Sequence, residues 1–240
     1  ALSHRNSKIF FGASLTSWTG LWMQRIAVSW LAWELTGSAL WVGALAFCDL
    51  APAVIVSPIA GAVADRADRL RMTMQSQAAI GLLAAATAVL VATDMMTIGM
   101  LLVLSVLGGI AASFAQPARQ SFMPGLVPAA DLPAAVALNS LTFNVARFIG
   151  PAIAGPIIAL AGVWPVIAIN ALAYLFATVT TPMLVIAATE RRGHAATGSL
   201  VGEVLDGLRY AARHPGLGPI LGFSAVSAVL LRGVQEILPP

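Results

Sequence analysis

The chain has 240 residues, of which 59% are hydrophobic and only 10% are charged. Globular domains carry about a quarter of their residues as charged side chains, so a soluble fold of this length could not bury this much apolar surface, whereas a bilayer can cover it. A formal net charge of only +3 does not indicate nucleic-acid binding, and the single cysteine, Cys48, excludes an internal disulfide. No cluster of Cys and His residues suggests a metal site, and no cofactor is expected.

Seven apolar segments are long enough to cross a membrane, which takes about 20 residues for a helix. In chain order they run over 9–33, 38–61, 72–93, 96–116, 133–161, 164–187 and 218–238. Helices are expected because open strands cannot satisfy their backbone groups in lipid. We therefore predict an all-α integral membrane protein with a bundle of six helices over 1–187, a cytoplasmic linker over 188–217 and the start of a second half over 218–240.

Basic residues between the segments mark only alternate connections. They precede the first segment and follow the second, fourth and sixth: Arg5, Lys8, Arg66, Arg69, Arg71, Arg119, Arg191, Arg192, Arg209 and Arg213. The other connections contain no Lys or Arg. The positive-inside rule therefore places the N-terminus and the even-numbered connections in the cytoplasm.

The linker begins with a polar stretch and continues with apolar residues at helical spacing, namely Leu200, Val204, Leu208 and Ala211. This pattern predicts an amphipathic helix at the cytoplasmic interface; a solvated helix without membrane contact is the alternative. The chain starts without Met and stops soon after the seventh segment, so we expect a fragment of a longer protein. A complete short protein that works as a homodimer is the less favoured interpretation.

The connection after the second segment runs from Gly61 to Arg71 and reads GAVADRADRLR. Gly61 would let a neighbouring helix approach closely, and Asp65 lies one turn further on the same face. The segment resembles the signature loop of the major facilitator superfamily, Gly-x-x-x-Asp-Arg-x-Gly-x-basic-basic. That resemblance implies that Asp65 and the cluster of Arg66, Arg69 and Arg71 latch the outward-open state. Arginines that only set the topology are the alternative interpretation.

The loop departs from the family pattern at two positions, because Asp68 replaces the second glycine and Leu70 replaces the first terminal basic residue. Asp tolerates a left-handed backbone better than most residues, so the turn is expected to survive.

Further motifs resemble the enterobactin-exporter and macrolide-efflux-like branch, the transmembrane secretion effector type of this superfamily. They are WMQR at 22–25, LTGS at 35–38, AQPARQ at 115–120 and ARFIGPAIAG at 146–155. The resemblance implies a protein of twelve spans in a bacterial cytoplasmic (inner) membrane. This chain would supply its N-terminal half, built from 3+3 inverted repeats, plus the linker helix and a truncated seventh span.

The fifth segment carries Gly150-Pro151 and Gly155-Pro156. These residues remove backbone donors and side-chain bulk in mid-helix, which permits a kink and close packing. The pattern resembles the Gly-Pro antiporter motif of facilitator exporters and favours export. A packing feature without a role in transport is the alternative.

Charges occur inside the spans at Arg25, Asp49 and Arg147, with Glu236 near the end of the seventh. Each costs about 2.5–3.5 kcal/mol at the bilayer centre on insertion scales, so an interior partner or a wet cavity is expected. Arg25 and Asp49 lie at similar depths in consecutive spans, which allows an ion pair. Arg147 lies nearer the midplane, one turn after Asn144, where facilitator cavities hold substrate.

We hypothesise that Asp49 is the protonatable group and that Arg25 and Arg147 hold it ionised or bind an anionic ligand. A structural ion pair that never titrates during transport is an equally weighted alternative. Gln24, Trp22 and Asn144 are candidate polar groups of a cavity, and each could equally form an interhelical hydrogen bond.

The expected function is a proton-coupled secondary exporter of a small amphipathic or anionic molecule, a drug or a siderophore, that works by alternating access. Its partners would be the bilayer, the substrate, protons and the missing second half. A non-transporting accessory or sensor protein on the same fold is the alternative. The sequence contains no Walker-type phosphate loop and no catalytic triad or metalloprotease motif, so no enzyme is predicted.

Overall fold

The computed structural model describes residues 5–122, 125 and 127–184, together with 202, 209, 210, 216, 218–220 and 223. The chain divides into two compact units, residues 1–195 and 196–240. All helices discussed below belong to the first unit. The predicted linker helix lies outside the described residues except at isolated positions, and so does the predicted seventh span.

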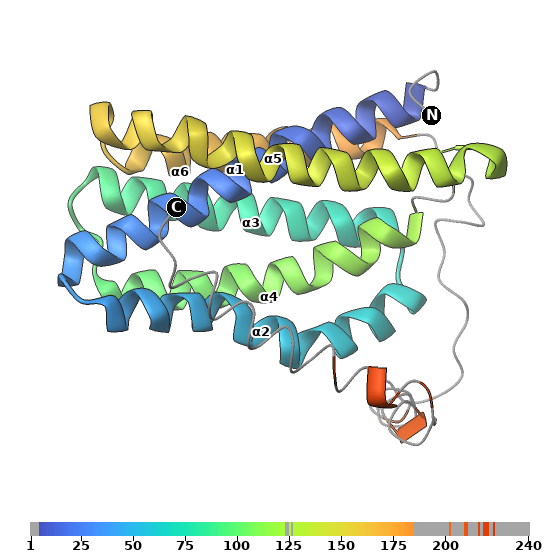
Figure 1. The fold of residues 1–240 in the computed structure, drawn as a ribbon, viewed down its shortest axis with the longest axis horizontal. Coiled ribbons are helices and arrows are strands. Elements are labelled where there is room, and N and C mark those ends of the chain that lie inside the picture. Colours follow the sequence, from blue (N-terminus) through green and yellow to red (C-terminus); the bar gives the residue numbers. More distant parts are fainter. Residues whose placement is uncertain are drawn as a thin grey trace. The chain divides into compact units, whose positions relative to one another are not determined.

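Six long helices form the first unit (Figure 1). They are α1 (Arg5–Thr36), α2 (Ala39–Arg66), α3 (Arg69–Ala92), α4 (Ile98–Phe122), α5 (Leu132–Ala161) and α6 (Trp164–Thr180), with short 3-10 turns η2 (Ala129–Asp131) and η3 (Thr181–Met183). Each of the first six apolar segments has therefore become one helix. The structure extends α1, α2 and α4 by several residues at their basic ends, where polar side chains had suggested a loop.

Five helical segments of the described chain are long and apolar enough to cross a membrane: Ala39–Arg66, Arg69–Ala92, Ile98–Gln120, Leu132–Ala161 and Trp164–Met183. Of the six predicted crossings that fall within the described residues, five are thus met in length and composition, and the seventh predicted span lies outside those residues. The helix α1 is long enough, with 32 residues, but it is more polar than the others. Its buried residues include Ser7, Ser14 and Ser17, so part of its polar surface faces neighbouring helices.

The helices pack in a pattern that repeats itself. The helix α1 packs on α5 and α6, α4 packs on α2 and α3, and α3 packs on α6. Exchanging α1 with α4, α2 with α5 and α3 with α6 maps this set of neighbours onto itself. In Figure 1, α1 starts at the end of the bundle where α4 finishes, so the two triplets run in opposite directions. This is the arrangement expected of a six-helix facilitator half built from 3+3 inverted repeats.

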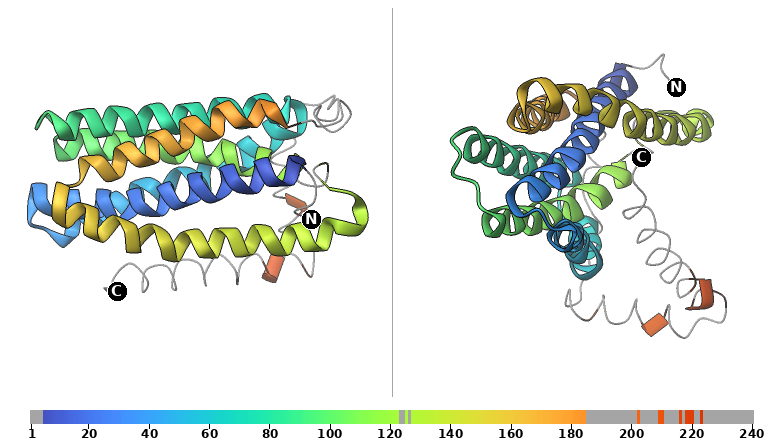
Figure 2. Two further views of the ribbon diagram at one scale, coloured as in Figure 1. Left: turned by 90° about the horizontal axis from the view of Figure 1, so that it is seen from above. Right: turned by 60° about the vertical axis from the view of Figure 1, so that its left-hand side comes forward.

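The connections alternate between the two ends of the bundle. Figures 1 and 2 place the turns after α1, α3 and α5 at one end, and the start of α1 with the turns after α2 and α4 at the other. In the part of the chain that the structure describes, the basic residues near helix ends therefore gather at the second end of the bundle: Arg5, Lys8, Arg66, Arg69, Arg71 and Arg119.

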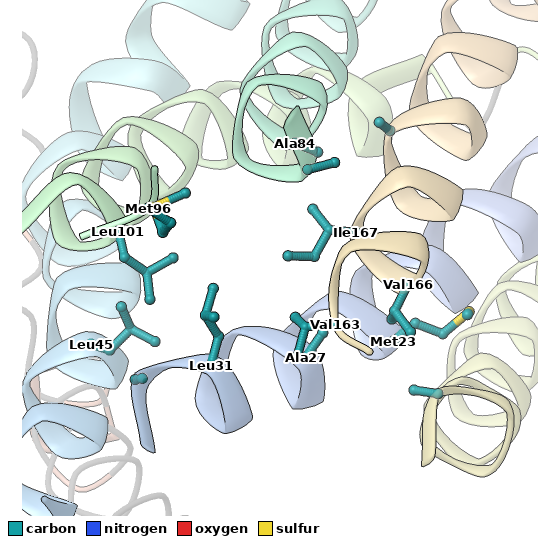
Figure 3. Packing of buried hydrophobic residues seen from close by; sticks show 14 residues of the cluster. Met23, Ala27, Leu31, Leu45, Ala84, Met96, Leu101, Val163, Val166 and Ile167 are labelled. Atoms are coloured by element: carbon teal, nitrogen blue, oxygen red, sulfur yellow. The ribbon is translucent and has the colours of Figure 1, made fainter. Parts of the chain in front are cut away.

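The largest apolar cluster draws residues from all six helices, α1 to α6 (Figure 3). Figure 3 shows Leu31 of α1, Leu45 of α2 and Leu101 of α4 directed toward one another, with Ile167 of α6 on the opposite side. Much of the rest of the cluster is alanine. Small residues allow helices to approach closely in lipid, where association depends on contact rather than on exclusion of water.

The turn between α2 and α3 forms without the left-handed residue that the sequence suggested. Asp68 has φ −67° and ψ 107°, and its side chain caps α3 by accepting hydrogen bonds from the backbone N–H groups of Leu70 and Arg71. The expectation of a left-handed Asp68 was therefore wrong. An aspartate at this position satisfies two donors at the helix N-terminus that a glycine would leave without a side-chain acceptor.

Candidate functional site

Arg25 of α1 and Asp49 of α2 form an ion pair, with 3.0 Å between Nη2 and Oδ2. Both lie twelve residues from Gly37, one before and one after the turn. Gly37 adopts φ +61° and ends α1, so the two antiparallel helices bring the residues to one depth, about 18 Å from the turn. The pair that the sequence allowed is thus formed, inside the span. Its side chains are 35% and 44% exposed.

The indole ring of Trp22 lies beside two guanidinium groups. The Cζ atoms of Arg25 and Arg147 are 5.0 and 5.1 Å from its centroid, within the range of cation–π attraction. Phe143 of α5 packs edge-to-face on the same indole at 5.9 Å and on Trp18 at 5.2 Å. The sequence named Arg25 and Arg147 as site residues, and the structure shows that Trp22 brings them together.

Gly150 determines how closely α5 approaches α1 at this point. A Cβ atom on Gly150 would lie 2.7 Å from Cβ of Trp22 and 3.0 Å from the backbone oxygen of Thr19. The close packing predicted for this residue is therefore present. For Gly155 it is not, because an added Cβ would meet no atom within 4 Å. Pro151 lies inside α5, which continues from Leu132 to Ala161 without a break.

Gln24 and Asn144 do not face each other. The Gln24 side chain accepts a hydrogen bond from the amide of Asn170 in α6, which is the interhelical alternative. Asn144 is exposed and donates to the backbone oxygen of Ser140, one turn earlier in its own helix, at 2.8 Å. Among the described residues, neither amide forms a hydrogen bond with Arg25 or Asp49.

The loop predicted to act as a latch lies where α2 ends and α3 begins, and a latching contact between two halves of the protein stays a prediction. Arg71 lies 3.9 Å from Asp68 rather than pairing with Asp65, and Asp65 is exposed at the end of α2. A Cβ atom on Gly61 would meet no atom within 4 Å, so no described helix makes the close approach expected there. Gly61 and Asp65 thus remain open on their outer face in this half.

A family model described as transmembrane secretion effector matches residues 1–239 of the chain. The chain belongs to this family of the major facilitator superfamily. The resemblance inferred from the loop and helix motifs is thereby confirmed, and the bundle is that of a multi-pass membrane protein of a bacterial transporter family.

Curated relatives of this secretion effector chain include transporters of different cargo. It is 34% identical over 160 residues to the staphyloferrin A transporter of Staphylococcus aureus, covering 64% of the chain and 39% of that relative. It is 27% identical to the multidrug efflux pump Tap of Mycolicibacterium fortuitum, covering 95% of the chain and 57% of the relative. Identity to the macrolide efflux protein A of Streptococcus pyogenes is 21%, with 96% and 57% covered. The chain thus spans little more than half the length of these relatives at most.

The bundle also holds a buried arginine whose role the sequence did not indicate. Arg119, which the sequence marks only as a cytoplasmic basic residue, is 9% exposed. It donates a hydrogen bond to Ser14 of α1, and its Cζ lies 4.1 Å from the ring centroid of Trp18 and 5.0 Å from that of Phe10. The spacing of Phe10, Ser14 and Trp18, four residues apart on one face of α1, is the signal that could have shown it.

Proposed function

We propose that this chain is the N-terminal half of a proton-coupled secondary exporter that moves a small amphipathic or anionic molecule by alternating access. The observation that carries the proposal is the Arg25–Asp49 ion pair at mid-depth of a facilitator bundle. Intramembrane charges are costly and are typically retained for transport. The relatives, a staphyloferrin A transporter, a multidrug efflux pump and a macrolide efflux protein, support transport of this class of cargo.

In this proposal Asp49 is the group that takes up and releases the proton. The ion pair joins α1 to α2, and a proton on Asp49 would remove its attraction for Arg25. If the ion pair stabilises one of the inward-open and outward-open forms more than the other, loss of the pair on protonation shifts the equilibrium between these two forms. Antiport follows when the substrate favours the opposite state.

The loop from Gly61 to Arg71 is proposed as the conformational gate on the cytoplasmic side. A Cβ atom on Gly61 would meet no atom of the described bundle within 4 Å, and Asp65 is exposed. Both observations fit a contact of this loop with a second half of the same protein. The basic residues at this end of the bundle support a cytoplasmic N-terminus in a bacterial inner membrane. Gly150, Pro151 and Gly155 would belong to the moving parts of α5.

The test is flux in proteoliposomes that contain the full-length protein and carry an imposed pH gradient. Asp49→Asn should abolish the acceleration of export by the gradient while leaving gradient-independent exchange. Undiminished proton-driven export in this variant would remove Asp49 from the coupling mechanism. An intact protein that moves no siderophore or drug under any gradient would favour the accessory or sensor interpretation.

A further inference from the structure

The charges around Trp22 do not balance. Both guanidinium carbons lie about 5 Å from one ring centroid, so they are at most about 10 Å apart. Asp49 neutralises Arg25, whereas no described carboxylate forms an ion pair with Arg147. The site therefore carries a net positive charge inside a membrane span, where a charge needs a counter-charge or water.

Two hydrogen-bond donors in the same cluster also lack acceptors. Nε1 of Trp22 and Nε of Arg25 are buried and have no partner among the described residues. Buried donors are normally paired, because leaving one unsatisfied is costly. The cluster thus combines positive charge with buried, unsatisfied donors, beside the aromatic rings of Trp22 and Phe143.

We propose that Trp22, Arg25 and Arg147 form a binding site for an anionic ligand with an apolar body. Its carboxylate, sulfonate or phosphate would lie between the guanidinium groups, which bind planar oxyanions through several N–H donors. Its body would pack on the indole. The inference rests on the proposed function, since it names the charge class of the substrate at that transport site.

A cationic ligand fits the same geometry poorly. The carboxylate that could attract it, Asp49, is already 3.0 Å from Arg25. A cation would have to displace Arg25 from Asp49, so it would gain one ion pair only by breaking another. It would also be repelled by the nearby guanidinium group of Arg147. The arrangement therefore selects by the sign of the charge.

The experiment uses the full-length protein in detergent and three probes of matched shape: naphthalene-2-sulfonate, 2-naphthalenemethanol and 2-naphthylmethylammonium. Equilibrium dissociation constants are measured by calorimetry on the wild type and on three variants. Arg147→Gln removes the cation, Arg147→Lys keeps its charge, and Lys8→Gln removes an exposed charge near the start of α1 as the matched control.

The sulfonate should bind at least tenfold more tightly than the alcohol, and the ammonium most weakly. Arg147→Gln should weaken sulfonate binding about tenfold, Arg147→Lys less, and Lys8→Gln not at all. Equal binding of the three probes by the wild type, or a preference for the ammonium, would overturn the proposal without any variant. Sulfonate binding without flux in proteoliposomes would support the anion site and refute the proposed exporter. Export of cations alone would support an exporter and refute the anion site.

Discussion

Among the described residues, Asp49 is the one carboxylate that forms an ion pair in the cluster around Trp22, and this determines how a proton and an anionic ligand influence each other. Protonation removes that charge and releases Arg25 from its pair. The direct electrostatic effect of the proton is therefore to strengthen anion binding, and by linkage the anion favours the proton. Exchange of a proton for an anion must then arise because protonation shifts the equilibrium between the inward-open and outward-open forms, and not because the proton and the anion compete for one site.

Replacing Asp49 by Asn, which resembles the protonated carboxyl, should tighten binding of naphthalene-2-sulfonate about 3- to 10-fold, because a charge near the ligand is lost. Calorimetry on the full-length protein measures this effect, with Asp49→Glu as the variant that keeps the charge. Weaker binding in Asp49→Asn would mean that the carboxylate orients the guanidinium groups more than it repels the ligand.

The second cationic cluster, around Arg119, contains an arginine that is nearly buried and is held by aromatic rings and one hydroxyl. Arg119→Ala removes the hydrogen bond to Ser14 and the cation–π contacts with Trp18 and Phe10, and it leaves a cavity. We expect a loss of about 2–4 kcal/mol of stability, seen as a lower unfolding temperature in detergent. Lys8→Ala, at an exposed position of α1, should leave that temperature unchanged; an equal loss in both variants would contradict the cluster's role.

At the scale of elements, two glycines of α5 form a matched pair. Gly150→Ala would place a Cβ 2.7 Å from Trp22 and 3.0 Å from backbone of α1, so the helices must separate and the variant should unfold at a lower temperature by an amount equivalent to about 1–3 kcal/mol. Gly155→Ala meets open space and should be neutral or slightly stabilising, because Ala favours helix. Thermal unfolding in detergent checks both; equal effects would show that the approach of α5 to α1 is not tight.

The sequence predicted what depends on spacing along one helix or across one short turn. The six helices follow from apolar length, and the Arg25–Asp49 pair follows from equal distances to Gly37. It could not predict which helices touch, so the burial of Arg119 against α1 and the shared indole of Trp22 were missed. Asp68 shows a third limit, since the family pattern suggested a glycine-like turn where the carboxylate instead caps α3.

At the scale of the molecule, α1 occupies a special place. It packs on α5 and α6 and also contacts α2, and it is the described long helix that is not apolar enough to be assigned as a span by composition. Several of its hydroxyls bond to its own backbone, as Ser17 does to Ala13, and Gln24 bonds to α6. Polar groups whose hydrogen bonds are satisfied in this way can lie inside the bilayer, because the high energetic cost falls on polar groups without a hydrogen-bond partner.

A crossing by α1 is therefore expected despite its polarity, and single cysteines can test it. In a Cys48→Ala background, Ala39→Cys and Thr93→Cys should react with a membrane-impermeant maleimide in intact cells. Lys8→Cys and Arg71→Cys should react only after permeabilisation, since the proposed topology places the basic end of the bundle in the cytoplasm. All four positions are exposed, so failure to react reports sidedness and not burial. If Lys8→Cys and Ala39→Cys react from the same side of the membrane, α1 does not cross it. Arg25 of α1 would then not lie at the depth of Asp49 in α2, and the ion pair could not form within the membrane.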